Sequence, residues 1–234
     1  MTNKNISIAI DGPVGAGKGT LAITLAKKLN ALYVYTGAMY RELALACLRE
    51  KTDIKDEEKV FEVLNKISIE FKPTNEGIKA FLNGEDVADE IFKPYVGKAV
   101  SVVAAFPKVR KEMVLRQRKI AEDAIKNGKN VVMEGRDIST DVIPNADLKI
   151  YLTADINIRA QRRFKQLEER GIKTSFDEVL KDIQERDRQD IQRNVSPLKI
   201  AENAIVIDTT DDRIEQTMEK VEKAMEKLRE ENLI

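Results

Sequence analysis

A glycine-rich loop near the start of the chain has the residue types and spacing of a phosphate-binding site. An apolar run, 6–10, precedes it, and an amphipathic run, 21–29, follows it. This order of strand, loop and helix is the context that a P-loop needs. Glycines let backbone N–H groups point inward, the start of the helix adds partial positive charge, and Lys18 supplies a mobile full charge. The residues expected to hold a phosphate chain are Gly12, Pro13, Val14, Gly15, Ala16, Gly17, Lys18, Gly19 and Thr20.

The residue after Lys18 departs from the usual P-loop pattern. A hydroxyl at that position ordinarily holds Mg²⁺, but Gly19 has none and the hydroxyl comes one residue later, at Thr20. Two alternatives follow: Thr20 contacts a phosphate, or the metal is held mostly by water and phosphate. The ending G-K-G-T resembles nucleoside monophosphate kinases more than GTP switches.

Charged residues follow two of the expected strands. Thr36 and Arg41 follow the short apolar run 31–35, and Glu134, Arg136 and Asp137 follow the apolar run 131–133. Ligands of an open parallel sheet bind beyond the carboxyl ends of its strands. A hydroxyl and an arginine at such an end suit an acceptor phosphate, and the alternative is an ordinary helix cap at Thr36 with a surface arginine.

Two later segments carry charged side chains at helical spacing. Arg159, Arg162 and Arg163 share one helix face, and Arg186, Asp190 and Arg193 form a stripe where a packed helix would be apolar. Spacing alone leaves a second interpretation open, because both sets suit a solvated, salt-bridged face.

Composition excludes several classes of function. The 234 residues contain no histidine, which removes Ser-His and Cys-His nucleophilic chemistry and most zinc sites. The formal net charge is zero, which argues against nucleic acid or a membrane as partner. Cys47 is the single cysteine, so no internal disulfide forms, and charged residues interrupt every apolar run. The chain shows no apolar signal segment, and we expect a cytoplasmic protein.

The pattern of elements predicts an α/β protein. Strands expected at 6–11, 31–35, 129–133, 147–153 and 204–208 alternate with helices, which favours a parallel sheet of five strands flanked by helices. Runs at 68–72, 78–82 and 85–87, with a turn at 73–77, predict a small inserted antiparallel sheet. A helix is expected over 89–105 and another from Pro107 to about 127. Asp155 is expected to cap a helix, and Asp211 or Asp212 to cap the last one.

Several motifs together resemble the bacterial cytidylate kinase family. They are I-D-G-P-x-G-A-G-K-G-T, T-G-A-M-Y-R, V-A-A-F-P-K-V-R, E-G-R-D and E-R-D-R-Q-D-I-Q-R, in order across nearly the whole chain. The resemblance implies a P-loop NTPase-type fold and transfer of the γ-phosphate of ATP, with Mg²⁺, to CMP or dCMP. It also implies a core of residues 1–36, 104–154 and 176–234, an acceptor-binding insertion at 37–103 and a lid at 155–175. We expect a monomer.

The resemblance also implies roles for individual residues. Arg41, Arg136 and Arg193 match arginines that hold the acceptor phosphate, with Thr36 beside them in the motif. Ser101, Arg110 and Asp137 match residues that read cytosine, and Arg186 and Asp190 match residues at the acceptor sugar. Lys18 matches the donor-phosphate lysine, and Arg159 and Arg163 match lid arginines that close on the transferring phosphoryl group.

Three positions depart from the family pattern. Tyr35 replaces an acid, Glu134 stands where Asp is common, and Ser139 stands where Gly is common. No metal ligand is therefore assigned.

Other functions remain as alternatives. The nearest alternative function is that of another kinase of small phosphorylated acceptors, such as uridylate or a related molecule. A nucleotide-dependent switch that hydrolyses its nucleotide slowly is less consistent with the sequence, because the chain lacks the N-K-x-D motif that recognises guanine. A P-loop protein associated with RNA is disfavoured by zero net charge and 5% aromatic content.

Overall fold

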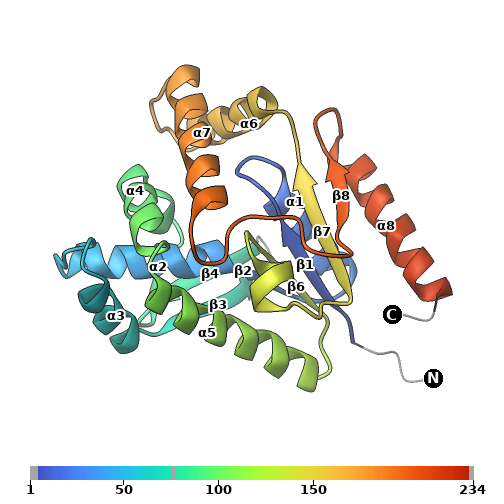
Figure 1. The fold of residues 1–234 in the computed structure, drawn as a ribbon, viewed down its shortest axis with the longest axis horizontal. Helices are drawn as coiled ribbons and strands as arrows, with labels where there is room; N and C mark the ends of the chain where they lie inside the picture. Colours follow the sequence, from blue (N-terminus) through green and yellow to red (C-terminus); the bar gives the residue numbers. More distant parts are fainter. Residues whose placement is uncertain (1–4, 75–76, 232–234) are drawn as a thin grey trace. The chain divides into compact units, whose positions relative to one another are not determined.

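The computed structural model describes residues 5–74 and 77–231 (Figure 1). The chain divides into two compact units, which we describe separately. The first unit contains Met1–Leu32 and Asp123–Ile234, and the second contains Tyr33–Glu122. The insertion expected at 37–103 lies within the second unit. The boundaries expected for core, insertion and lid remain a prediction.

A five-stranded sheet is built in the order β2-β6-β1-β7-β8. Its strands are β1 (Ser7–Asp11), β2 (Leu32–Tyr35), β6 (Val131–Gly135), β7 (Leu148–Thr153) and β8 (Ile205–Asp208). β1 pairs in parallel with both β6 and β7, and β7 pairs in parallel with β8. The register sets Asp11 opposite Gly135, so β1 and β6 end at the same edge. The residues that follow both strands are thereby brought together.

Two of the four long helices in the described part of the first unit begin at residues whose side chains cap them. The four helices are α1 (Lys18–Lys28), α6 (Ile156–Glu169), α7 (Phe176–Gln192) and α8 (Ile214–Glu230). Asp155 caps α6 as expected, through the backbone N–H groups of Asn157 and Ile158. Ser175 and Glu178 form a capping box at α7. The expected cap of α8 is wrong by one or two residues, because Arg213 occupies that position.

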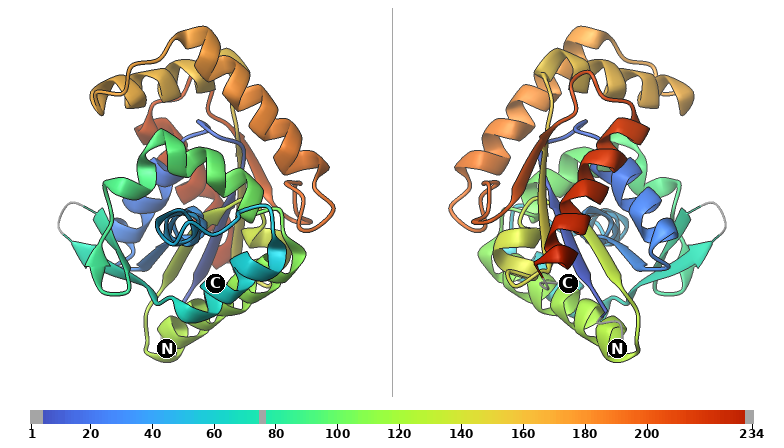
Figure 2. Two further views of the ribbon diagram at one scale, coloured as in Figure 1. Left: turned by 90° about the vertical axis from the view of Figure 1, so that its left-hand side faces the viewer. Right: turned by 90° about the vertical axis from the view of Figure 1, so that its right-hand side faces the viewer.

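Helices α6 and α7 form a hairpin with its own small core. Ala160, Val179 and Ile183 are buried between them, and the two helices contact each other at an angle (Figures 1 and 2). Because Val14 of the P-loop packs against the same cluster, the hairpin is in apolar contact with the loop.

The second unit combines helices with a three-stranded antiparallel sheet. Its helices are α2 (Thr36–Arg49), α3 (Glu57–Lys66), α4 (Pro94–Val103) and the start of α5 (Pro107–Lys126). Its sheet, in the order β3-β4-β5, contains β3 (Ile69–Thr74), β4 (Gly77–Leu82) and β5 (Glu85–Asp86). The core is formed by α2 with α3, α4 and β4, and includes Leu43, Leu64, Val96 and Met113.

Three expectations for the second unit are wrong in detail. The helix expected over 89–105 is divided into a short 3₁₀-helix, η1 (Glu90–Phe92), and α4. Lys93 has ψ 148° between them because the following proline disfavours helical backbone. Thr36 does not cap α2 but is its first residue; Tyr35 precedes the helix and makes no side-chain cap. The turn expected at 73–77 is wrong at its ends, because Pro73 and Thr74 belong to β3 and Gly77 begins β4; residues 75–76 lie outside the described residues.

Within the described chain, no helix has the length and apolar character needed to cross a membrane.

Candidate active site

The glycines of the P-loop are required by its backbone and by its neighbours. Gly12 has φ 148° and lies so close to β7 that a Cβ there would approach the carbonyl oxygen of Leu152 to 2.2 Å. Gly15 has φ 78°, and its Cβ would lie 2.6 Å from the carbonyl oxygen of Arg159. Gly17, with φ 90°, precedes α1 in the left-handed region. The loop therefore presents backbone rather than side chains to a ligand.

Lys18 begins α1 and is buried, with an exposed fraction of 7%. Its Nζ donates a hydrogen bond to the carbonyl oxygen of Pro13 at 2.7 Å. Burial, followed by the positive charge of Arg136, holds the pKa of Lys18 well below its usual value, although Glu134 and Asp190 oppose this. An anionic phosphate would relieve both effects, so this lysine is suited to bind one.

Glu134 lies beside Gly19 at the end of β6. A Cβ at position 19 would approach Glu134 Oε1 to 3.1 Å. The carboxylate, 5% exposed, therefore occupies the space beside the residue where other P-loops carry a hydroxyl. Gly19 and Glu134, which both depart from common sequence patterns, are therefore neighbours in the structure.

Asp11 fixes the segment after β6. Its two carboxylate oxygens accept hydrogen bonds from the backbone N–H groups of Ile138 and Ser139, at 2.9 and 2.7 Å. These residues begin η2 (Ile138–Val142), a single turn of π-helix that follows Asp137. Asp11 was not among the predicted site residues. The available signal was its position at the end of a buried strand next to the P-loop.

Arg136, Asp137, Asp190 and Arg193 form a buried charge network. Arg136 Nε donates to Asp190 Oδ2 at 2.7 Å. Arg193 has its Nη1 3.7 Å from Asp190 Oδ1 and its Nη2 3.8 Å from Asp137 Oδ1. Burial alone would raise the pKa of Asp190, but the charges of Arg136, Arg186 and Arg193 hold it below its usual value. Asp190 and Arg193 therefore belong to a buried charge network and not to a solvated face.

The three arginines of α6 have different surroundings. Arg159 is buried: its Nη1 donates to the carbonyl oxygen of Val14 at 3.1 Å and to Asp187 Oδ2 at 2.6 Å. Arg162 donates to the carbonyl oxygen of Thr209 at 2.6 Å, so it holds the segment after β8. Arg163 donates to Gln166 Oε1 at 3.4 Å on the outer part of the helix. Asp187 of α7, which accepts the hydrogen bond from Arg159, was not among the residues predicted from the sequence, although it lies inside the E-R-D-R motif.

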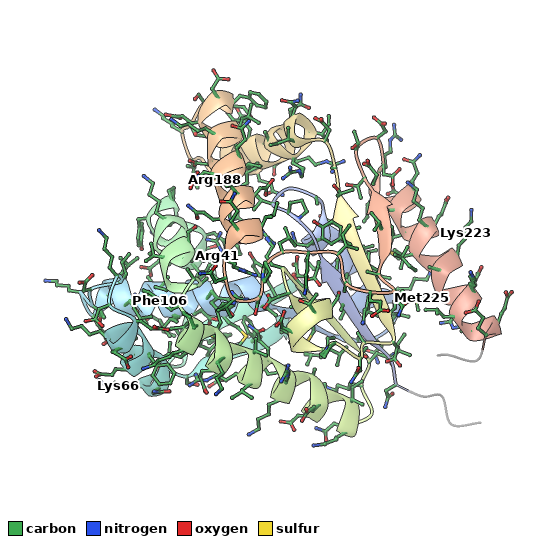
Figure 3. The ribbon with its side chains drawn as sticks, viewed as in Figure 1. Arg41, Lys66, Phe106, Arg188, Lys223 and Met225 are labelled. Carbon is green, nitrogen blue, oxygen red and sulfur yellow. The ribbon has the colours of Figure 1, made fainter. Side chains whose placement is uncertain are left out.

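Arg41 is the buried arginine of α2 in the second unit. It is 5% exposed, and its Nη1 donates to the carbonyl oxygen of Ile91 at 2.9 Å. In the described part of the chain, no carboxylate forms an ion pair with Arg41. Its charge is thus available for an anion. Figure 3 labels it beside the residues of α4.

Arg110 of α5 is 2% exposed. Its Nη1 donates to the carbonyl oxygen of Ala104 at 3.0 Å, and its guanidinium lies 5.4 Å from the ring centroid of Tyr40. Ser101 lies in α4 and is half-buried, and Thr36 is buried.

The predicted residues are divided between the two units. The first unit contains the P-loop with Arg136, Asp137, Arg159, Arg163, Arg186, Asp190 and Arg193, and the second contains Thr36, Arg41, Ser101 and Arg110. Within the first unit, electrostatic contacts link Lys18, Arg136 and Asp190. Two motifs distant in sequence, the P-loop and the α7 stripe, therefore contribute to one charged cluster.

A match to a protein-family model identifies the family of this chain. The model described as cytidylate kinase matches residues 8–227. The chain belongs to the cytidylate kinase family. A cytidylate kinase of Caldanaerobacter subterraneus subsp. tengcongensis is 49% identical over 219 residues, which are 94% of each chain. A cytidylate kinase of Bacillus cytotoxicus is 46% identical over 216 residues, covering 92% of this chain and 94% of the relative.

Solved structures of other kinases are more distant. A shikimate kinase from Bacteroides thetaiotaomicron is 13% identical, with a TM-score of 0.46 over 94% of this chain and 98% of its own. A deoxyadenosine kinase from M. mycoides is 16% identical, with a TM-score of 0.40 over 95% and 100%. The strand order of the sheet, and not these similarities, carries the fold assignment. Both the family and the five-stranded α/β class expected from the sequence are confirmed.

Proposed function

We propose that the P-loop and Lys18 bind the phosphates of ATP, and that Arg41, Arg136 and Arg193 bind the phosphate of CMP or dCMP. The reaction is that of the cytidylate kinase family: the γ-phosphate of ATP passes to the nucleoside monophosphate and ADP is released. The observation that carries the proposal is the burial of Lys18 in a cluster with Arg136 and Asp190 next to the P-loop.

Transfer of a phosphoryl group requires positioning and neutralised charge more than covalent chemistry. The acceptor phosphate has a second pKa near 6, so it is already an anionic nucleophile at neutral pH. A general base is not needed, which agrees with the absence of histidine. Two anions must approach each other, however, and this requires cations that are held in place.

The three acceptor arginines meet that requirement. The side chains of Arg136 and Arg193 are 16% and 11% exposed, and Arg41 is 5% exposed. Arginines that merely solvate a surface are far more exposed; Arg188, on the outer side of α7, is 63% exposed. Restricted guanidinium groups lose little entropy when they bind a phosphate.

Selection of cytosine is assigned to Asp137, Arg110 and Ser101. Cytosine carries a 4-amino donor where uracil carries a carbonyl acceptor. A carboxylate such as Asp137 accepts from the amine and opposes the carbonyl, and Arg110 donates to the ring acceptors. Arg186 and Asp190 are assigned to the acceptor sugar, Thr36 to the acceptor site, and Arg159 and Arg163 to the transferring phosphoryl group, on the family resemblance. We also propose that the enzyme is a monomer.

Mg²⁺ is the metal that this chemistry requires, and the residues beside the P-loop fit it. Glu134 supplies a buried carboxylate next to Gly19, and Mg²⁺ prefers oxygen ligands while it retains several waters. No group of three possible metal-ligating side chains occurs among the described residues, so phosphate and water would complete the coordination. When bound with ATP, Mg²⁺ neutralises developing charge on the phosphates. Glu134 would hold it, and Lys18 and the loop backbone would orient the phosphates.

Replacing either Arg41 or Arg193 with alanine is expected to weaken binding of the acceptor and to leave binding of ATP largely intact. A charge-assisted hydrogen bond to phosphate contributes about 1.5–3 kcal/mol, so the dissociation constant of CMP should rise roughly tenfold or more for each. Calorimetric titration with CMP and, separately, with ATP measures both effects.

Arg188→Ala is the matched control, since it removes an exposed arginine from the same helix as Arg193 and should change neither constant. Equal loss of ATP affinity in Arg41→Ala and Arg193→Ala would move these residues to the donor site or to a structural role.

A further inference from the structure

A pair of stacked aromatic rings in the second unit contacts Arg41 through one of its members. The rings of Tyr35 and Phe92 are stacked, with centroids 6.2 Å apart and planes inclined by 6°. The guanidinium carbon of Arg41 lies 5.3 Å from the centroid of the Phe92 ring. Phe92, at the end of η1, thus contacts both Arg41 and the ring of Tyr35, which lies at the end of β2.

The stack is fixed at both ends. A Cβ at Gly37 would lie 2.7 Å from the Tyr35 ring, so the ring rests directly on the backbone of the first turn of α2. At the other end, the carbonyl oxygen of Ile91, the residue before Phe92, accepts a hydrogen bond from Arg41 Nη1. Gly97 of α4 borders the same Nη1, at 3.9 Å from the position of a Cβ.

The type of partner matters for a guanidinium that must bind phosphate. A carboxylate partner would neutralise Arg41 and compete with the ligand. An aromatic ring attracts the cation through its quadrupole without supplying a negative charge, and a peptide carbonyl uses only one of the five N–H donors. Arg41 is therefore restrained while its charge remains uncompensated by any carboxylate among the described residues.

We propose that Tyr35 and Phe92 are positioning residues for the acceptor phosphate: their stack orients the Arg41 guanidinium. This inference rests on the acceptor role of Arg41 proposed above. The proposal also assigns a function to Tyr35, which replaces the acid that is common at this position. Without the stack, Arg41 would sample more rotamers and would lose more conformational entropy on binding the phosphate.

Phe92→Leu tests the proposal because it keeps an apolar side chain and removes the ring. We expect the dissociation constant of CMP to rise about threefold to thirtyfold, the range of a partly to fully desolvated cation–π contact, with that of ATP unchanged. Phe92→Tyr retains the ring and should restore wild-type affinity. Phe61→Leu makes the same change in α3, at a ring that is not part of the stack, and should not change the affinity for CMP. Tyr35→Leu should act in the same direction as Phe92→Leu, and Tyr35→Phe should not.

A double-mutant cycle with Arg41→Ala separates positioning from structural support. If Phe92 acts through Arg41, Phe92→Leu causes no further loss of CMP affinity in the Arg41→Ala background. An equal loss in both backgrounds, or no loss in the wild-type background, overturns the inference. If Arg41→Ala alone leaves CMP affinity unchanged, the acceptor role of Arg41 itself fails, and the positioning role fails with it.

Discussion

Lys18→Met is expected to lower kcat by roughly a hundred- to a thousandfold, the cost of removing one preorganised charge from a phosphoryl-transfer site. Methionine keeps an unbranched side chain of similar length, so α1 and the glycine loop should remain folded. The lost group is the Nζ that now donates to the carbonyl oxygen of Pro13 at 2.7 Å. The measurement is steady-state release of ADP at saturating ATP, Mg²⁺ and CMP.

Lys28→Met provides the matched control. Lys28 lies in the last turn of the same helix, with a side chain that is 54% exposed and paired with Glu222. It should keep kcat within about twofold, because surface pairs of this kind contribute little. Retention of kcat by Lys18→Met would remove Lys18 from the donor site.

One buried carboxyl group is expected to lower the free energy of unfolding progressively between about pH 5 and pH 9. Glu42 follows Arg41 in α2 and has no exposed surface. Neither of its carboxyl oxygens has a hydrogen-bond partner among the described residues. Burial raises the pKa of Glu42 from 4.5 to about 9.

The sign of the effect follows from where the proton is held. The folded protein keeps the proton on Glu42 up to about pH 9, whereas the unfolded chain releases it above 4.5. The unfolded state then binds fewer protons, so the free energy of unfolding decreases as pH rises through this window. At pH 7 the loss relative to pH 4.5 is about 3 kcal/mol, at about 1.4 kcal/mol per pH unit.

Glu42→Gln isolates this contribution because it keeps the shape and removes the ionisation. The difference in free energy of unfolding between Glu42→Gln and wild type, from urea titrations, should increase in favour of Glu42→Gln from pH 5 to pH 9. Glu50→Gln makes the same substitution at an exposed residue after the end of the same helix and serves as the control. A flat profile for Glu42→Gln would show that Glu42 is ionised in the folded protein.

The parts of the fold that were predictable from sequence depend on local patterns. The P-loop is specified by its own glycines and by its flanking elements, and the alternation of strands and helices is enough to indicate a parallel sheet. The cap of α6 at Asp155 is a signal of the same kind. Each of these features is decided by residues within a few positions of one another.

The parts that were not predictable depend on contacts between distant segments. Asp11 binds backbone groups at Ile138 and Ser139, and Asp187 reaches Arg159 from a separate helix. No spacing rule connects such residues. The stack of Tyr35 on Phe92 is a further case, since a ring in place of an acid indicated a departure but not its partner.

We propose that CMP is the acceptor and that the site selects it by its 4-amino group. The most direct measurement is ADP formation from ATP and Mg²⁺ by the purified chain with CMP, with UMP, or with no acceptor. We predict turnover that depends on CMP, with kcat/KM for CMP well above that for UMP. ADP formation that is independent of CMP, or comparable kcat/KM values for CMP and UMP, would contradict it.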